Sequence, residues 1–344
     1  MGTAFLYIFI SAAFFAAQFI FIKTYQARTQ PGILSSIWSA ILNGGWKIVI
    51  FGIACGFQCA FTVQSGLYAA GYAVSAIACS LATLHALKLG NLSTIVLYTL
   101  VGGNALPFVY SLLFTGAELT FFCAAGFASM LLSFLPSVLS AKRQDAKTSE
   151  REAAAMKNPA APLAPANGHG KKYLFLLLCL ITFFSNGLVS VFSDANAKAY
   201  SSGTGVDSSS FLVWSGLISI VLAGGIFCAA LIQQKVKTGR GFLSILPVSV
   251  QNAGRRACRK RILFLMAVMG IYSVLNGLGN VFSLKAAEPP MQGAVQFPVL
   301  NAAIMIFTPI FTRLVWKEKI ARSDMLGIGI AVVGLAFFLL DAIN

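Results

Sequence analysis

The stretch KTYQARTQPGILSSIWSAI, residues 23–41, is repeated in outline by KAYSSGTGVDSSSFLVWSGLI, residues 198–218. Each copy has Lys-x-Tyr, a polar gap, and then Trp-Ser followed by a small and an aliphatic residue. The offset is 175 residues between Lys23 and Lys198, and 176 residues between the two tryptophans. A register this constant indicates a duplicated unit.

The composition places this unit in a membrane. Hydrophobic residues make up 58% of the chain and charged residues only 10%, with a mean hydropathy of +0.81. One water-soluble globule of 344 residues cannot bury that much apolar surface. A spanning helix needs roughly 20 mostly apolar residues. Ten segments meet this standard: 4–22, 33–54, 62–86, 91–114, 119–139, 173–193, 210–232, 262–284, 291–314 and 323–341. The sequence therefore predicts an all-α integral membrane protein with ten transmembrane helices.

Two polar stretches interrupt the apolar pattern. Residues 140–172 are rich in Ala, Pro and charged side chains, a composition typical of a flexible linker. The linker separates a first five-helix half, residues 1–139, from a second half, residues 173–344. The second stretch, the basic loop 233–261, ends in RRACRKR. A basic run beside a membrane helix is typical of an orientation signal or a contact with anionic lipid headgroups. Membrane lipids are thus expected partners, and nucleic acid is not.

The charges also predict an orientation. All but three of the 25 lysine and arginine residues lie in or beside the loops after the first, third, fifth, seventh and ninth segments. The exceptions are Lys47, Lys198 and Lys285. The positive-inside rule places the basic loops in the cytoplasm and both termini outside. We expect the plasma membrane to be the location of such a multi-pass chain.

The duplication continues through the whole half. Tyr72 aligns with Tyr272 and Glu118 with Glu318, both at an offset of 200 residues. Because five is an odd number of spans, two copies in series lie in the membrane with opposite orientations. Inverted repeats are typical of transporters, in which the solute is held near the midplane while one half rocks against the other.

Two longer stretches carry a resemblance to a known family. They are HALKLGNLSTIVLYTLVGGNALPFVYSLLFTGAELT, residues 85–120, and LKAAEPPMQGAVQFPVLNAAIMIFTPIFTRLVWKEKIARSDMLGIGIAVVGLAFFLL, residues 284–340. Each contains a short turn, a helix with a late proline (Pro107 and Pro309) and a glutamate in the next turn. The chain resembles the drug/metabolite transporter superfamily in its EamA-like branch, over nearly its whole length outside the two polar stretches. The resemblance implies ten helices in two repeats and a transport function, and it is silent on the solute. Many members keep both termini in the cytoplasm, whereas the charges here place them outside.

Polar side chains inside a bilayer are costly and normally face a cavity or a partner helix. Tyr272, Asn276 and Asn280 are spaced i, i+4, i+8 and share one helical face. Other polar or aromatic residues expected inside the segments or near their ends are Gln296, Asn301, Gln18, Asn186, Tyr72, Tyr98, Asn104, Trp38 and Trp214. Together they are candidates for a neutral, hydrogen-bonding substrate site. The alternative is interhelical hydrogen bonding, worth roughly 0.6 to 2 kcal/mol per contact.

Charged side chains at depth are few. Lys47 is the only one expected well inside a segment, where it could contact an anionic substrate or extend its stem toward the headgroups. Glu118 ends the sequence TGAE, which fits a capping box starting at Thr115. Asp194 lies near a segment end. Coupling through a buried acid is therefore not expected, and a proton-coupled antiporter using Asp194 or Glu118 stays an alternative.

The remaining chemistry is sparse. Seven cysteines and two histidines form no metal-ligand or catalytic pattern, so neither a cofactor, a metal site nor an enzyme is predicted. The cysteines, including the C-x3-C pair Cys55 and Cys59, are interpreted as small hydrophobic residues. The predicted function is alternating-access transport, as a facilitator, exchanger or exporter, of small neutral or zwitterionic polar metabolites. A channel or cation carrier is a further alternative, and no oligomeric state is indicated.

Overall fold

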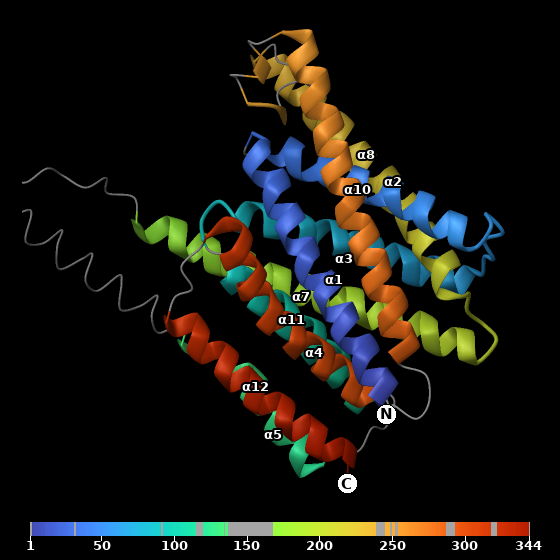
Figure 1. Cartoon of the computed structure of the whole chain (residues 1–344). Helices are drawn as coiled ribbons and strands as arrows, with labels where there is room; N and C mark the ends of the chain where they lie inside the picture. Colours follow the sequence, from blue (N-terminus) through green and yellow to red (C-terminus); the bar gives the residue numbers. More distant parts are fainter. Residues whose placement is uncertain are drawn as a thin grey trace, which may run out of the picture.

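The computed structural model of this chain is helical, with no strand in the part that it describes (Figure 1). That part comprises residues 2–30, 32–90, 92–114, 120–133, 135–136, 168–238, 245–247, 250–251, 254–286, 293–317 and 322–343. Its main helices are α1 (Gly2–Arg28), α2 (Ile33–Ala54), α3 (Val63–Ala86), α4 (Leu92–Phe114), α5 (Phe121–Leu132), α7 (Gly168–Ser201), α8 (Ser208–Thr238), α10 (Arg255–Ala286), α11 (Gly293–Trp316) and α12 (Arg322–Ile343). The expected all-α class is confirmed.

Seven of the described helices are long and apolar enough to cross a membrane: α1, α2, α3, α7, α8, α10 and α11. Three shorter apolar stretches, Thr94–Tyr110, Phe121–Leu132 and Met325–Phe338, lie in α4, α5 and α12. Large apolar side chains such as Leu67, Phe184 and Val221 are exposed on the outside of the bundle, as a lipid-facing surface requires. The chain is a multi-pass membrane protein, and the number of ten transmembrane helices remains a prediction.

Several helices extend beyond the apolar segments that predicted them. α7 begins at Gly168, inside the stretch interpreted as linker, and α10 begins at Arg255, so the RRACRKR motif is helical. Lysine and arginine are good helix formers, and a helix satisfies its own backbone hydrogen bonds past the apolar core. Apolar length therefore marks the membrane portion of each helix and not the helix end. Of the predicted linker, residues 140–167 lie outside the described residues.

The cap predicted for the fifth helix is wrong. α5 begins at Phe121, and Thr120 is its N-cap, with its side-chain oxygen accepting a hydrogen bond from the Cys123 backbone N–H at 3.1 Å. A capping box starting at Thr115 would require the helix to begin five residues earlier. Glu118 itself lies outside the described residues.

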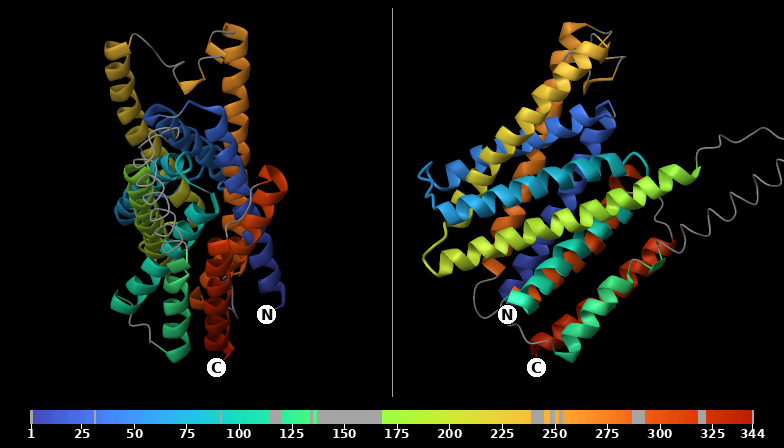
Figure 2. Two further views of the ribbon diagram at one scale, coloured as in Figure 1. Left: turned by 90° about the vertical axis from the view of Figure 1, so that its left-hand side faces the viewer. Right: turned by 180° about the vertical axis from the view of Figure 1, so that it is seen from behind.

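The two halves of the chain interleave (Figures 1 and 2). α1 packs against α10 and α11, α2 against α8 and α10, α3 against α7 and α8, and α4 against α7 and α11. α5 pairs with α12 at one edge of the molecule, as the views in Figure 2 show. Every main helix of the first half thus contacts at least one helix of the second, so the interior of the protein is the interface between the halves.

Two of these contacts are crossings of glycine on glycine. A Cβ atom on Gly44 of α2 would lie 2.9 Å from the Gly216 carbonyl oxygen of α8, and the reverse distance is also 2.9 Å. At the α5·α12 crossing, Gly126 and Gly334 are related in the same way, at 3.0 and 2.9 Å. Small residues let membrane helices approach closely enough for extensive van der Waals packing. Both crossings join helices that the predicted repeat makes equivalent.

Hydrogen bonds donated by backbone N–H groups also show which loops share an end of the bundle. The Gln30 N–H, just after α1, donates to the Ile245 carbonyl, in the segment between α8 and α10, at 2.8 Å. The Ala60 N–H, between α2 and α3, donates to the Ser210 hydroxyl at the start of α8 at 3.2 Å. Each contact joins regions that the predicted topology puts on one side of the membrane.

Candidate functional site

The predicted polar face of α10 forms a chain of amides with α1. Asn276 Nδ2 donates to Gln18 Oε1 at 2.8 Å. Asn280 Nδ2 donates to the Asn276 carbonyl at 2.8 Å and to Asn276 Oδ1 at 3.2 Å. Among the described residues, Gln18 Nε2 and Asn280 Oδ1 have no hydrogen-bond partner. A donor and an acceptor are therefore available at the two ends of this chain.

A second amide pair joins α4 to α11. Asn301 Nδ2 donates to Asn104 Oδ1, and Asn104 Nδ2 reaches the Met130 sulfur of α5 at 3.5 Å. Asn104 is buried and Asn301 half-buried. A thioether sulfur is a weak acceptor, so the Asn104 amide keeps hydrogen-bonding capacity for a stronger partner.

Asn186 connects α7 to α4. Its Nδ2 donates to the Thr99 carbonyl at 2.8 Å. The amide passes over Gly103, where a Cβ atom would lie only 2.7 Å from Asn186 Nδ2. Glycine at this position makes the contact possible. Asn186 is thus held by the neighbouring helix, as the interhelical alternative requires.

Three of the predicted aromatic residues, unlike the amides, lie in apolar packing contacts or near a helix end. Tyr98 lies in an apolar cluster with Ile95 and Cys179, and Trp38 packs against Phe227 with ring centroids 5.7 Å apart. Trp214 Nε1 donates to the Ala60 carbonyl at 2.8 Å, near the start of α8. None of these contacts joins the aromatic groups to the amide chains. The side chain of Gln296 lies outside the described residues.

Lys47 is buried inside the bundle, with 6% of its surface exposed. Its Nζ donates to the Tyr72 hydroxyl of α3 at 3.4 Å and lies 4.8 Å from the centroid of the same ring. Among the described residues no carboxylate lies within ion-pair distance of this ammonium group. A buried cation is costly unless it is paired. One hydroxyl and one ring face leave Lys47 able to bind an anion.

Tyr72 links Lys47 to the surrounding helices. Its ring meets Phe211 of α8 edge-on, with centroids 5.5 Å apart. Tyr272 lies on the same face of α10 as Asn276, and it packs against a different apolar cluster from Tyr72. Tyr72 of α3 thus contacts both α2 and α8.

Sequence reasoning missed Asn43. Ser273 of α10 donates to Asn43 Oδ1 of α2 at 2.9 Å. Asn43 and Lys47 are spaced i, i+4, so they share one face of α2. The same spacing rule that selected the α10 face would have selected this pair.

The Asp194 carboxylate forms an ion pair. It lies 2.6 Å from Lys198 Nζ, one turn later on α7. The Lys198 ammonium also lies 5.5 Å from the Tyr110 ring centroid on α4, and Lys23 lies 5.3 Å from the Trp316 ring centroid on α11. Lys23 and Lys198 thus each lie near an aromatic ring of a helix from the other half.

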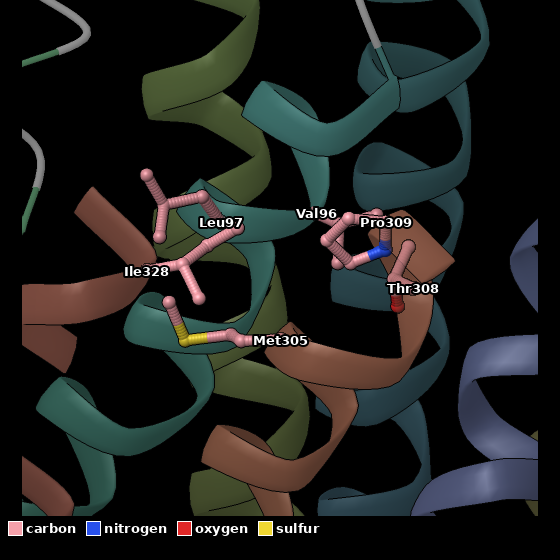
Figure 3. Close-up of a pocket in the computed structure, with 6 residues that line it drawn as sticks. All are labelled: Val96, Leu97, Met305, Thr308, Pro309 and Ile328. Atoms are coloured by element: carbon pink, nitrogen blue, oxygen red, sulfur yellow. The ribbon is translucent and has the colours of Figure 1, made fainter. Parts of the chain in front are cut away.

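A small pocket is lined by none of these residues (Figure 3). It is lined by Val96, Leu97, Met305, Thr308, Pro309 and Ile328, from α4, α11 and α12. Its volume is about 10 Å³, roughly enough for one water molecule. Pro309 has no N–H to donate to the Met305 carbonyl, which is the backbone acceptor that a water could satisfy there. The pocket is too small for a metabolite.

Comparisons with known proteins bear on the fold. No family model and no curated protein matches this sequence. A protein of known crystal structure, described by no more specific name than "protein", is similar in fold, with a TM-score of 0.51 and 14% sequence identity. The similarity covers 98% of this chain and 99% of the other. At this identity the likeness shows that the whole chain shares one fold with the solved structure.

Proposed function

We propose that this chain is an alternating-access transporter of the plasma membrane, working as a facilitator, exchanger or exporter. Its solutes are small polar metabolites, neutral or zwitterionic. It contains two inverted five-helix repeats, and the solute binds between them. The observation that carries this proposal is the way in which the helices pair across the halves.

The pairing keeps its pattern when the halves are exchanged. If α1 to α5 are matched in order with α7, α8, α10, α11 and α12, the α1·α10 contact becomes α7·α3, and α1·α11 becomes α7·α4. The contacts α2·α8, α4·α11 and α5·α12 map onto themselves. This supports two repeats related by a pseudo-two-fold axis in the membrane plane, a symmetry by which one scaffold can open to either side.

The polar residues on this interface favour an uncharged or zwitterionic solute. Gln18 and Asn276 lie on the α1·α10 contact, and Asn104 and Asn301 on the α4·α11 contact. Amides both donate and accept hydrogen bonds without carrying charge. Lys47 is the proposed partner for the carboxylate of a zwitterion, since its ammonium group is buried and has no acidic partner among the described residues.

Proton-coupled antiport and cation transport have less support. Both mechanisms would use a carboxylate at depth, whereas Asp194 is paired with Lys198 and is partly exposed. The second candidate acid, Glu118, lies outside the described residues. Gradient-driven transport is therefore the form of the proposal that we favour.

Counterflow in proteoliposomes tests the proposal. Vesicles are preloaded with an unlabelled solute and diluted into a trace of the labelled solute, across a panel of amino acids, purines, sugars and drugs. An alternating-access carrier transiently concentrates the label inside, because each inward step is exchanged for an outward one. Equilibration without an overshoot would indicate a pore, and no movement of any solute in the panel would contradict the proposed solute class.

A further inference from the structure

The turn between α2 and α3 brings two thiols together. Cys55 Sγ and Cys59 Sγ lie 3.2 Å apart, and both residues are partly exposed. Cys55 caps the C-terminal end of α2, and Cys59 follows four residues later. A disulfide needs a sulfur separation of about 2.05 Å. The thiols therefore need to approach by little more than 1 Å, a motion that side-chain rotation can supply.

The backbone of this turn holds the pair in place. Gly56 and Phe57 both have left-handed φ values, 60° and 58°, which is unusual for phenylalanine. The Phe57 N–H donates to the Gly52 carbonyl at 2.7 Å, and the Phe57 ring packs over Gly52. The Gln58 N–H donates to the Cys55 carbonyl at 3.1 Å. The chain thus reverses direction in this turn, and Phe57 folds back over the C-terminal end of α2.

Helix α8, from the other half of the protein, contacts the same turn. Ala60 donates its N–H to Ser210 and accepts a hydrogen bond from Trp214 Nε1 at 2.8 Å. The Phe61 ring meets the Trp214 ring edge-on, with centroids 4.9 Å apart. The residue after the thiol pair is therefore fixed to α8, so a covalent link between Cys55 and Cys59 would stiffen a contact between the two halves.

We propose that Cys55 and Cys59 are a disulfide-forming pair that is oxidised by exchange with a low-molecular-weight or protein disulfide. One thiolate attacks the disulfide and displaces its first thiolate, which gives a mixed disulfide with the chain. The second cysteine, as its thiolate, attacks that bond and displaces the other thiolate. The two cysteines lose two protons and two electrons in total, and the incoming disulfide is reduced to two thiols. Neither step depends on the proposed transport function.

The predicted orientation favours this chemistry. The charge distribution places the turn after the second helix on the outer side of the membrane, where disulfides form and persist. The other cysteines of the chain, Cys79, Cys123, Cys179, Cys228 and Cys258, lie within α3, α5, α7, α8 and α10. The α2–α3 turn thus holds the two cysteines that lie between helices.

Oxidised glutathione is the probe for the test. The purified full chain is reduced, freed of reductant, incubated with oxidised glutathione, and mapped by peptide mass spectrometry. The wild type is expected to lose two hydrogens in a peptide linking Cys55 to Cys59 and to carry no glutathione there. Cys55→Ser and Cys59→Ser are each expected to retain one glutathione on the remaining cysteine, because the resolving thiol is gone.

The control is Cys228→Ser, which removes an exposed cysteine on α8 and should leave the Cys55–Cys59 link unchanged. A wild-type protein in which both cysteines stay thiols would overturn the proposal. So would one in which each carries a stable glutathione adduct, because a competent pair resolves the first adduct. The wild-type map decides the question even if a serine variant fails to fold.

Discussion

Gly44 and Gly216 meet where α2 crosses α8, and each glycine faces the carbonyl oxygen of the other. A Cβ atom on either would lie 2.9 Å from that oxygen, a distance that forces the backbone to shift. The next residue, Gly45, has nothing within 4 Å of a Cβ position. Two adjacent glycines of one helix therefore have opposite tolerance for a side chain.

Gly44→Ala is expected to destabilise the protein by about 1 to 3 kcal/mol, the usual cost of overpacking. Gly45→Ala should be neutral or slightly stabilising, since alanine favours a helix by about 1 kcal/mol over glycine. Thermal unfolding of the two variants in the same detergent measures the difference. Equal stabilities would show that the α2·α8 crossing is not the close contact described above.

Asn276→Leu tests the amide chain. The change removes the hydrogen bond to Gln18 while keeping α10 apolar, so we expect transport to fall with expression and folding intact. Gln18→Leu and the double variant complete a cycle. If the two side chains only hold α1 to α10, the loss appears as about 0.6 to 2 kcal/mol of stability and transport by the folded fraction is unchanged. That result would make Asn276 a packing residue.

Lys47→Met removes the buried positive charge and should weaken transport of solutes that carry a carboxylate. For a solute that carries a carboxylate we expect the apparent KM to rise about tenfold, which corresponds to about 1.4 kcal/mol of binding. The matching amide analogue, in which an uncharged amide group replaces the carboxylate, should be transported as before. Tyr72→Phe keeps the ring and removes the hydroxyl, so it separates the effect of the Lys47–Tyr72 hydrogen bond from that of the Lys47 charge. An equal effect of Lys47→Met on both solutes would assign Lys47 a structural role.

Transport should respond little to an imposed proton gradient, because Asp194 is paired with Lys198 at 2.6 Å. Initial rates in proteoliposomes are compared with and without a step of about two pH units, which supplies roughly 2.7 kcal/mol per proton. Accumulation driven by the step alone, and lost in Asp194→Asn, would identify Asp194 as a coupling residue. It would also replace the facilitator proposal with an antiporter.

Disulfide formation in the α2–α3 turn should accelerate with pH. The hydrogen bond with Cys55, together with burial and the negative charge of Asp207, raises the pKa of Cys59 to about 11. Only the thiolate attacks a disulfide, so at each pH below that value its fraction falls about tenfold per unit. We expect the rate with oxidised glutathione to rise roughly tenfold per unit between about pH 7 and pH 9. A rate independent of pH would show that the thiolate of this pair is not the attacking group.

Apolar length predicted the all-α membrane class, and the repetition predicts two equivalent halves. The all-α membrane class follows from apolar segments long enough to span a bilayer. The duplicated Lys-x-Tyr motif predicts two equivalent halves. Helix ends were less well predicted: basic residues continue α7 and α10 beyond their apolar cores, and Thr120 caps α5 in place of Thr115. Hydropathy reports the lipid environment, whereas the ends of a helix depend on backbone hydrogen bonding and side-chain caps.

The residues of the proposed site were selected from the sequence, but their partners were not. The i, i+4, i+8 rule found Asn276 and Asn280 because periodicity depends on one helix only. It did not supply Gln18 as their partner, nor Tyr72 as the partner of Lys47, since each pair joins helices from distant parts of the chain. The spacing rule could have selected Asn43 but not its partner, Ser273 of α10.

By itself, the sequence determined that this is a helical membrane protein with few charged residues in its apolar segments, and its repeated motif predicts two equivalent halves. Composition and period are properties of the chain, and they carry that information directly. The tertiary structure decided that α2 crosses α8 at two glycines, that amides pair across α1 and α10, and that a left-handed turn sets Cys55 beside Cys59. These contacts depend on how surfaces far apart in sequence fit together, and shape complementarity of that kind exists only once the chain is folded.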